Sequence, residues 1–286
     1  MTDENRNPID PASFDAYAPD RIALRIEAAG ITKGTLPVVP TLTLAFLAGA
    51  FIALGAMFYL VTITQSGLGF GPTRFIGGIA FSLGLILVIV GGAELFTGNV
   101  LLVMGWAHKK VSGATLWRNW GLVYAGNLAG AVAMALMAWW AGIGALGGGE
   151  LGVTLVKVAA AKVALPFDVA FVRGILCNVL VCLAVWLSFA AHSVVSKILA
   201  IVFPIAAFVA LGFEHSIANM FFIPAGIFLA GDPAFAEAAG TTVAARADIA
   251  VLGLLHNLVP VTLGNIVGGG VFVALSYYLA YLYGRD

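Results

Sequence analysis

Charged residues are scarce in this chain, and neither sign is in excess. Asp, Glu, Lys and Arg make up 10% of the 286 residues, and the formal net charge is zero. A soluble domain carries about a quarter of its residues as charged side chains. With a net charge of zero, nothing suggests nucleic-acid binding, so no nucleic-acid partner is expected.

Cysteine and histidine are rare as well, and they do not cluster. Cys177 and Cys182 lie five positions apart in one apolar segment, where a helix cannot bring them into disulfide geometry. The four histidines are scattered, whereas an enzyme site needs converging ligands or an acid–base pair beside a nucleophile. Neither a cofactor nor an enzymatic activity is therefore expected. Residues 1–20 contain no apolar stretch, so no cleaved signal peptide is predicted.

Long apolar runs dominate instead. Hydrophobic residues make up 61% of the chain, and the mean hydropathy is +1.03. A helix of about 20 residues crosses the hydrocarbon core, and the runs that reach this length are 41–64, 75–107, 119–143, 166–191, 198–229 and 249–283. The second and fifth runs are over-long and contain polar motifs, which favours broken helices. The sequence predicts an all-α integral membrane protein with six transmembrane helices, the second and fifth of them broken.

Three short motifs recur in the same order in both halves of the chain. AFxxG occurs at 45–49 and 170–174, ExxxxN at 94–99 and 214–219, and GNxxG at 126–130 and 264–268. They fall in successive apolar runs, which indicates two copies of a three-helix unit, at about 41–143 and 166–283. Because three is odd, the copies face opposite ways. Inverted repeats with helices interrupted at matching places are typical of transporters and channels, whose path lies between the halves.

The distribution of basic residues predicts that both termini lie in the cytoplasm, with the inner (plasma) membrane as the location. Nine basic residues then face the cytoplasm, namely Arg6, Arg21, Arg25, Lys33, Lys109, Lys110, Arg118, Lys197 and Arg285, and four lie outside, namely Arg74, Lys157, Lys162 and Arg246. Residues 1–40 are expected to form a cytoplasmic segment. Within it, residues 14–34 form either an amphipathic helix on the membrane surface or a solvated tail that orders only in part.

The breaks in the two long helices point to the functional site. Irregular backbone at membrane depth is tolerated only where protein or a polar cavity satisfies its amides and carbonyls. In each break a glutamate (Glu94 or Glu214) can accept hydrogen bonds, and an asparagine (Asn99 or Asn219) opens the next half-helix. The positive N-terminal ends of such half-helices favour an anion. The alternative is that these four residues only hold the breaks together.

His215 is the one histidine expected deep in the membrane, because the other three fall near the ends of apolar runs. A lone histidine among apolar residues is more often a packed core residue, but a position inside a break favours function. Imidazole exchanges its proton near neutral pH, and desolvating a bare anion costs many kcal/mol. A proton shared from His215 would make a weak-acid anion neutral and lower that cost.

Four motifs together resemble the formate/nitrite transporter family. They are AELFTG at 93–98, VCLAVW at 181–186, GFEHSIANM at 212–220 and VTLGN at 261–265. The resemblance extends over almost the whole chain from about residue 20. It implies six spans in an aquaporin-like arrangement, a homopentamer with one path through each protomer, and passage of small monovalent weak-acid anions such as formate, nitrite or hydrosulfide.

The resemblance also implies roles for individual residues. His215 is the residue that exchanges a proton, and Thr97 on the opposite break is its hydrogen-bond partner. The polar groups expected along the path are Asn178 and Asn265, besides the glutamates and asparagines of the breaks. The constrictions are expected at Phe81 and Phe208 on the outer side and at Leu85, Phe96 and Val181 on the inner side. Apolar rings of this kind exclude hydrated ions from the histidine.

Lys162 matches a basic residue of the family's outer vestibule, where it would raise the local anion concentration. The alternative for Lys162 is an ordinary loop charge.

The choice of anion rests on weaker signals. Arg173 lies about eight residues into the fourth run, where some nitrite-type members are basic and formate channels are apolar. The segments MFFIPAG at 220–226 and GNIVGGG at 264–270 are more similar to the formate branch, so formate is favoured over nitrite or hydrosulfide. An aquaporin-like pore for neutral solutes is the alternative of a different class, but the chain lacks the paired Asn-Pro-Ala half-helices that it needs.

Overall fold

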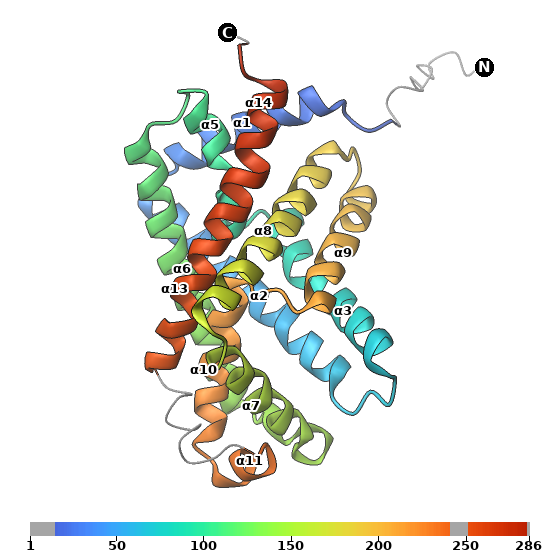
Figure 1. Ribbon diagram of the computed structural model, residues 1–286. Coiled ribbons are helices and arrows are strands. Elements are labelled where there is room, and N and C mark those ends of the chain that lie inside the picture. The colour runs from blue at the N-terminus through green and yellow to red at the C-terminus, as the bar shows by residue number, and fades with distance from the viewer. Residues whose placement is uncertain (1–14, 241–250, 285–286) are drawn as a thin grey trace, which may run out of the picture.

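The computed structural model describes residues 15–240 and 251–284, and within these residues the chain is helical with no strand (Figure 1). The elements in order are α1 (Pro19–Thr35), α2 (Val38–Ile63), α3 (Phe70–Gly91), α4 (Phe96–Asn99), α5 (Leu102–Ala107), α6 (Gly113–Trp140), the 3₁₀ helix η2 (Ile143–Gly149), α7 (Glu150–Val163), α8 (Phe167–Ala190), α9 (Val194–Leu211), α10 (Ser216–Ala230), α11 (Pro233–Ala238), α13 (Val251–Val267), the π-helix η3 (Gly268–Leu275) and α14 (Ser276–Tyr281).

Both predicted helix breaks are present. The run 75–107 is divided into α3, α4 and α5, and the run 198–229 is divided into α9 and α10. By length and composition, seven helical stretches of the described residues could cross a membrane. The stretch that the sequence did not predict is Ile143–Val163, which joins η2 and α7 across non-helical backbone at Leu146, Gly147 and Gly148.

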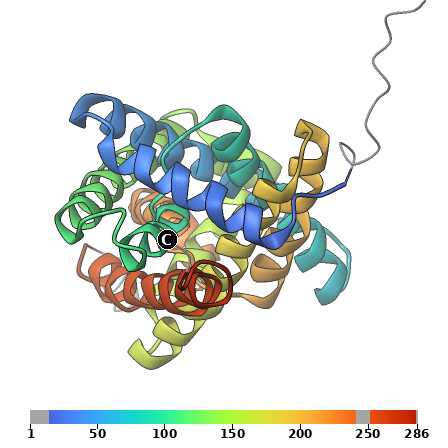
Figure 2. The ribbon, with the colours of Figure 1, turned by 90° about the horizontal axis from the view of Figure 1, so that it is seen from above.

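The helices pack as two similar groups. α2 lies against α3 and α6 in the first group, α8 lies against α9 and α13 in the second, and α3 packs against α9 between the groups. α1 and α14 lie at one end of the molecule, and α7 and α11 lie at the other (Figure 1). Seen along the long axis, α1 runs across the first of these ends (Figure 2). Its buried residues, which include Ile22, Ile26 and Gly30, form one helix face, and α1 packs against α5, α6 and α8. A position of this segment on the membrane surface stays a prediction.

The GNxxG motifs bring backbones into direct contact. A Cβ atom on Gly130 would lie 2.0 Å from the Phe46 carbonyl oxygen, and a Cβ atom on Gly268 would lie 2.2 Å from that of Ile175. Phe46 is thus equivalent to Ile175 and not to Phe171, so the AFxxG part of the predicted repeat is wrong by one helical turn. A helix returns to the same face after about four residues, and motifs of small and aromatic residues can recur there without being equivalent.

Replacing Gly49 with alanine should destabilise the protein. The new Cβ atom would lie 2.1 Å from the backbone oxygen of Asn127, which cannot move without separating α2 from α6. Overpacking of this kind costs roughly 2 kcal/mol, which for a chain of this length lowers the melting temperature of the purified protein by about 5 °C. Gly71→Ala is the matched control, since nothing lies within 4 Å of its Cβ position. Equal melting temperatures for the two variants would contradict the proposed close contact.

Candidate functional site

The two helix breaks have the same backbone geometry. α3 and α9 each end at a glycine in the left-handed region, Gly92 at φ 80° and Gly212 at φ 72°. A residue with a side chain is strained there. The half-helices that follow, α4 and α10, each begin after an extended residue, Leu95 or His215. The breaks are therefore equivalent turns in the two halves of the chain.

An asparagine from the GNxxG motif holds each break. The Asn127 amide donates to the carbonyl oxygens of Ala45 (2.7 Å) and Glu94 (2.9 Å), and its oxygen accepts from the Phe96 amide (2.9 Å). Asn265 repeats this pattern with Gly174 (2.8 Å), Glu214 (3.0 Å) and the Ser216 amide (2.9 Å). Both asparagines are fully buried. Their carboxamides replace the helical partners that the broken backbone lacks, and a path-lining role for Asn265 stays a prediction.

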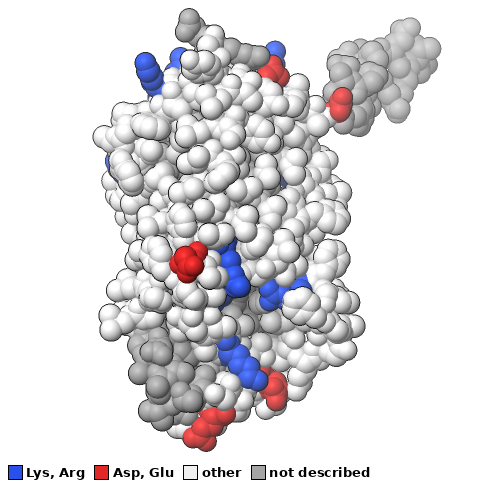
Figure 3. Space-filling model, viewed as in Figure 1, with Lys and Arg blue, Asp and Glu red and all other residues white. Residues whose placement is uncertain are grey.

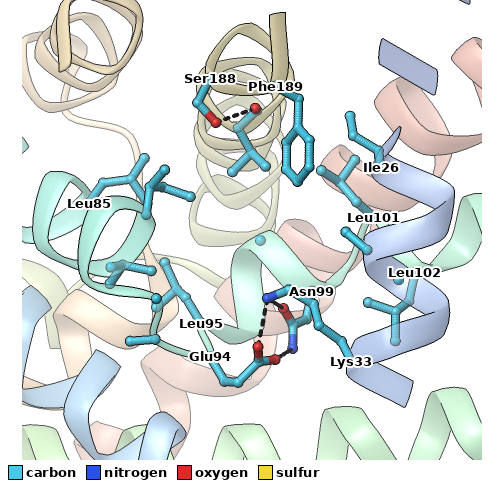
Figure 4. Close-up of a pocket in the computed structure, with 18 of the residues that line it drawn as sticks. Ile26, Lys33, Leu85, Glu94, Leu95, Asn99, Leu101, Leu102, Ser188 and Phe189 are labelled. Carbon is cyan, nitrogen blue, oxygen red and sulfur yellow. Dashed lines mark hydrogen bonds and ion pairs between the residues drawn. The ribbon is translucent and has the colours of Figure 1, made fainter. Parts of the chain in front are cut away.

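Beside the first break lies a polar cluster, which we call the Lys33 cluster: Lys33, Glu94, Asn99 and Asn119. The Lys33 ammonium lies 2.9 Å from the Glu94 carboxylate and donates to the Asn99 oxygen at 3.0 Å. The Asn99 amide donates to Glu94 (2.6 Å) and to Asn119 (3.0 Å), and Asn119 donates to the Lys33 carbonyl (3.2 Å). Lys33, Glu94 and Asn99 line a pocket of about 230 Å³, which we call the α1 pocket (Figure 4).

The second break carries the matching Lys162 cluster: Lys162, Glu214, Asn219 and Asn257. The Lys162 ammonium donates to both Glu214 oxygens, at 3.0 and 3.1 Å. The Asn219 amide donates to Glu214 (2.6 Å) and to Asn257 (2.7 Å), and Asn257 donates to the Lys162 carbonyl (2.9 Å). Lys162, Glu214 and Asn219 line a second pocket, of about 200 Å³, which we call the α7 pocket.

Sequence reasoning missed Lys33, Asn119 and Asn257, although the sequence holds signals for all three. Lys33 and Lys162 each begin a K-x-x-L-P segment, at 33–37 and 162–166. Asn119 and Asn257 each precede the asparagine of GNxxG by eight positions. The repeat therefore includes a helix before the first span, α1 in one half and α7 in the other. Lys162 lies in the last turn of α7 and not in a loop.

The histidine and the threonine meet between the two halves. The Nε2 atom of His215 lies 2.9 Å from the Thr97 hydroxyl oxygen, and both residues are buried. The Ala218 amide donates to Nδ1 of His215 at 3.0 Å, so the histidine caps α10. Because an amide can only donate, Nδ1 is the acceptor, and the neutral imidazole carries its proton on Nε2. His215 therefore donates to Thr97.

The predicted constriction residues fall into two groups. The rings of Phe81 and Phe208 pack edge to face at 5.7 Å, Phe208 stacks on His215 at 5.9 Å, and all three line the α7 pocket. Leu85 lines the α1 pocket. Phe96 packs against Trp120 and Tyr124, and neither it nor the buried Val181 lines either pocket. In their place, Leu95 and Val185 line the α1 pocket.

Asn178 lies against the Thr97 backbone. Its amide donates to the carbonyl oxygens of Thr97 (3.2 Å) and Asn265 (2.7 Å), while its own side-chain oxygen is buried without a partner. A buried, unpaired acceptor of this kind normally finds a water or another donor. Asn178 lines neither the α1 pocket nor the α7 pocket, and its role along the path stays a prediction.

Cations outnumber anions in both pockets. Arg25, Lys33 and Lys197 line the α1 pocket with Glu94, and Arg74, Lys162 and Arg173 line the α7 pocket with Glu214. Most of the surface in Figure 3 carries no charge, and the Lys and Arg side chains on its lower half lie close together. Within the described residues, no three His, Cys, Asp or Glu side chains are close enough to hold a metal. The arrangement suits a small anion.

Residues 20–279 match the formate/nitrite transporter family. The chain belongs to this family. It is 42% identical to the formate channel FocA of Escherichia coli K12 over 277 residues, which cover 96% of this chain and 97% of that protein. The family consists of transporters and this relative is a channel, so this formate/nitrite transporter is a transport protein and not an enzyme.

Solved structures agree with this assignment. A pentameric formate channel with formate bound superposes with a TM-score of 0.79 at 42% identity, covering 86% of this chain and 98% of that one. An ion channel of the same family gives 0.78 at 30% identity, covering 91% and 98%. With its apolar helices of membrane-crossing length, this formate/nitrite transporter is a multi-pass membrane protein.

Proposed function

We propose that this protein conducts small monovalent weak-acid anions, formate foremost, and that His215 exchanges a proton with the permeant. The single observation that carries the proposal is the buried hydrogen bond between Thr97 and His215. It joins the two breaks, and His215 lines the α7 pocket. The names of FocA and of the formate-bound structure favour formate, while nitrite and hydrosulfide are the alternatives within the family.

The permeant would pass from one pocket to the other through an apolar zone. On one side, Leu85, Leu95 and Val185 bound the α1 pocket, and on the other, Phe81 and Phe208 bound the α7 pocket. A hydrated anion loses water on entering such a zone, at a cost of many kcal/mol. The Nε2 proton of His215 and the free oxygen of Asn178 are the polar groups that would meet the permeant there.

Net transfer of that proton needs a change at the other ring nitrogen. A neutral ring that gave its Nε2 proton to formate would become an imidazolate, so Nδ1 first takes up a proton from water. The imidazolium then gives its Nε2 proton to formate, which becomes neutral formic acid. The resting ring returns when Nε2 takes a proton back from the formic acid and Nδ1 releases its proton to water. Nδ1 is occupied by the Ala218 amide, so its protonation breaks the cap of α10. Loss of a helix cap costs about 1 kcal/mol. This cost is small enough to permit proton exchange, and it favours the neutral form of His215 at rest.

We further propose six spans in an aquaporin-like arrangement, formed by α2, α3–α5, α6, α8, α9–α10 and α13–α14. α7 is the counterpart of α1 and precedes a span as α1 does, so it is not counted. The basic residues favour both termini in the cytoplasm, which would put the α1 pocket on the cytoplasmic side, and the inner membrane is the proposed location. A homopentamer is proposed by likeness to the pentameric channel.

Uptake into proteoliposomes tests the proposed function. We expect formate to enter protein-containing vesicles faster than protein-free ones across a pH series, with nitrite and hydrosulfide measured alongside. Glycerol, followed by vesicle swelling, tests the neutral-solute pore. Rapid glycerol flux without formate flux would overturn the proposal.

We also propose that Lys162 lies in the outer vestibule. Its ammonium donates to both carboxylate oxygens of Glu214. Lys162→Met should lower stability by roughly 3 kcal/mol, because it leaves Glu214, 4% exposed, as an unpaired buried charge. Glu214→Gln in the same chain removes that charge and should recover most of the loss in melting temperature. If the double variant is no more stable than Lys162→Met, the Lys162 ammonium does not act by holding Glu214.

A further inference from the structure

The α7 pocket holds charges that largely cancel. The Lys162 ammonium is bound to both oxygens of Glu214, so this pair adds little net charge. The break itself is also balanced, since the N-terminal end of α10 carries about +0.5 of a charge and the C-terminal end of α9 about −0.5. The net positive charge of the pocket therefore resides on its two arginines, Arg74 and Arg173.

Of these two, Arg74 is fixed on the negative end of α9. Its Nε donates to the Ala210 carbonyl oxygen at 3.0 Å, and one terminal nitrogen donates to that of Val209 at 2.9 Å. These are carbonyls of the last turn of α9, where the helix runs out of amides to bind them; that of Val209 also accepts from the Gly212 amide at 3.1 Å. The Tyr59 hydroxyl lies 3.5 Å from the other terminal nitrogen, and no carboxylate among the described residues forms an ion pair with Arg74.

The local fold makes room for this contact. Arg74 lies near the start of α3, and α3 packs against α9. At the turn that ends α9, a Cβ atom on Gly212 would lie 2.9 Å from the guanidinium of Arg74. Glycine at this position thus permits both the left-handed turn and the approach of the arginine.

We propose that Arg74 is the residue that makes the α7 pocket attractive to the permeant anion. It cancels the negative end of α9, so that the positive end of α10 and the remaining arginine charge act on the anion unopposed. Lys162 holds Glu214 and contributes little to the field. Arg74 is a positioning residue: it acts by binding the C-terminal end of α9 and offsetting the negative charge there, and it does not touch the permeant.

The other half of the chain carries a counterpart. Lys197 lies near the start of α9 and lines the α1 pocket together with Val88 and Gly92, at the end of α3. Thus α3 carries Arg74 near its N-terminal end, at the α7 pocket, where α9 ends. In turn, α9 carries Lys197 near its N-terminal end, at the α1 pocket, where α3 ends. The arrangement suits a path that anions enter from both sides.

The test compares variants that remove the same charge from the same pocket. Arg74→Gln keeps amide donors for the α9 carbonyls but loses the charge, Arg74→Lys keeps the charge, and Arg173→Gln removes a charge that is exposed and has no hydrogen-bond partner in the described structure. The readout is the formate concentration that gives half-maximal uptake into proteoliposomes, measured on pentamers isolated by size exclusion.

We expect Arg74→Gln to raise this concentration about fivefold, as the loss of one charge in a partly solvated site predicts, with a smaller change in maximal uptake. Arg74→Lys should stay close to the unmodified protein, and Arg173→Gln should show a smaller rise than Arg74→Gln. An unchanged value for Arg74→Gln, or equal rises for the two glutamine variants, would overturn the inference.

If Arg74→Gln fails to assemble, Arg74→Lys decides. If the formate concentration for half-maximal uptake by Arg74→Lys is close to that of the unmodified protein, the charge of Arg74 is what matters. A full loss of uptake by Arg74→Lys would show that only the arginine hydrogen bonds matter and would contradict the inference. The inference rests on the proposed function, but the two can fail separately. Absence of formate uptake by the unmodified protein refutes the function, and normal uptake with insensitivity to Arg74→Gln refutes only the role of Arg74.

Discussion

Replacing His215 with asparagine should abolish formate flux in a protein that still folds. Asparagine caps helices as well as any residue, so it can replace Nδ1 as the acceptor of the Ala218 amide, but it has no exchangeable ring proton. Proton transfer by a positioned group contributes about 10² to 10⁴-fold in rate. Uptake of formate by proteoliposomes should therefore fall by at least two orders of magnitude.

His215→Phe is the companion variant, because phenylalanine keeps a ring but removes both the proton and the cap. It should lose flux as completely as His215→Asn and should in addition melt at a lower temperature. Formate flux near normal in folded His215→Asn would show that the histidine serves only as a helix cap.

Thr97→Val should reduce formate flux by roughly three- to tenfold, because it keeps the volume of the side chain and removes one hydrogen bond, worth about 0.5–1.5 kcal/mol. The hydroxyl is the acceptor of the Nε2 proton in the structure, at 2.9 Å. Without the Thr97 hydroxyl, no hydrogen bond holds the Nε2 proton of His215 in place. The dependence of formate flux on pH should therefore also shift.

A double-mutant cycle checks that the two residues act together. Adding Thr97→Val to His215→Asn should cost little further flux, because residues that act as a unit are not additive. An unaltered pH profile in folded Thr97→Val, or full additivity in the cycle, would be incompatible with coupling across the two breaks.

Much of the site could be predicted because the chain repeats itself. ExxxxN and GNxxG mark equivalent places in the two halves, and the structure puts a break and its asparagine at both. The contact of Thr97 with His215 was expected from the family resemblance, and it is present. The over-long runs correctly indicated that α3 and α9 end within the membrane-length segments.

Other features depend on contacts that local patterns do not specify. The side-chain amides of Asn127 and Asn265 reach across from neighbouring helices, and spacing within one segment gives no sign of such partners. α7 carries two lysines and a glutamate, which lowered its hydropathy and concealed its equivalence to α1. The cap on Nδ1 of His215 requires the exact backbone turn before α10.

The central claim is that the permeant takes up a proton on its way through. The ratio of formate flux to chloride flux in the unmodified protein tests this most directly, because both are small monovalent anions and chloride does not accept a proton near neutral pH. The account predicts that formate crosses at least ten times faster than chloride at equal concentration and voltage, and that His215→Asn removes this preference. Chloride flux equal to formate flux in the unmodified protein would contradict it.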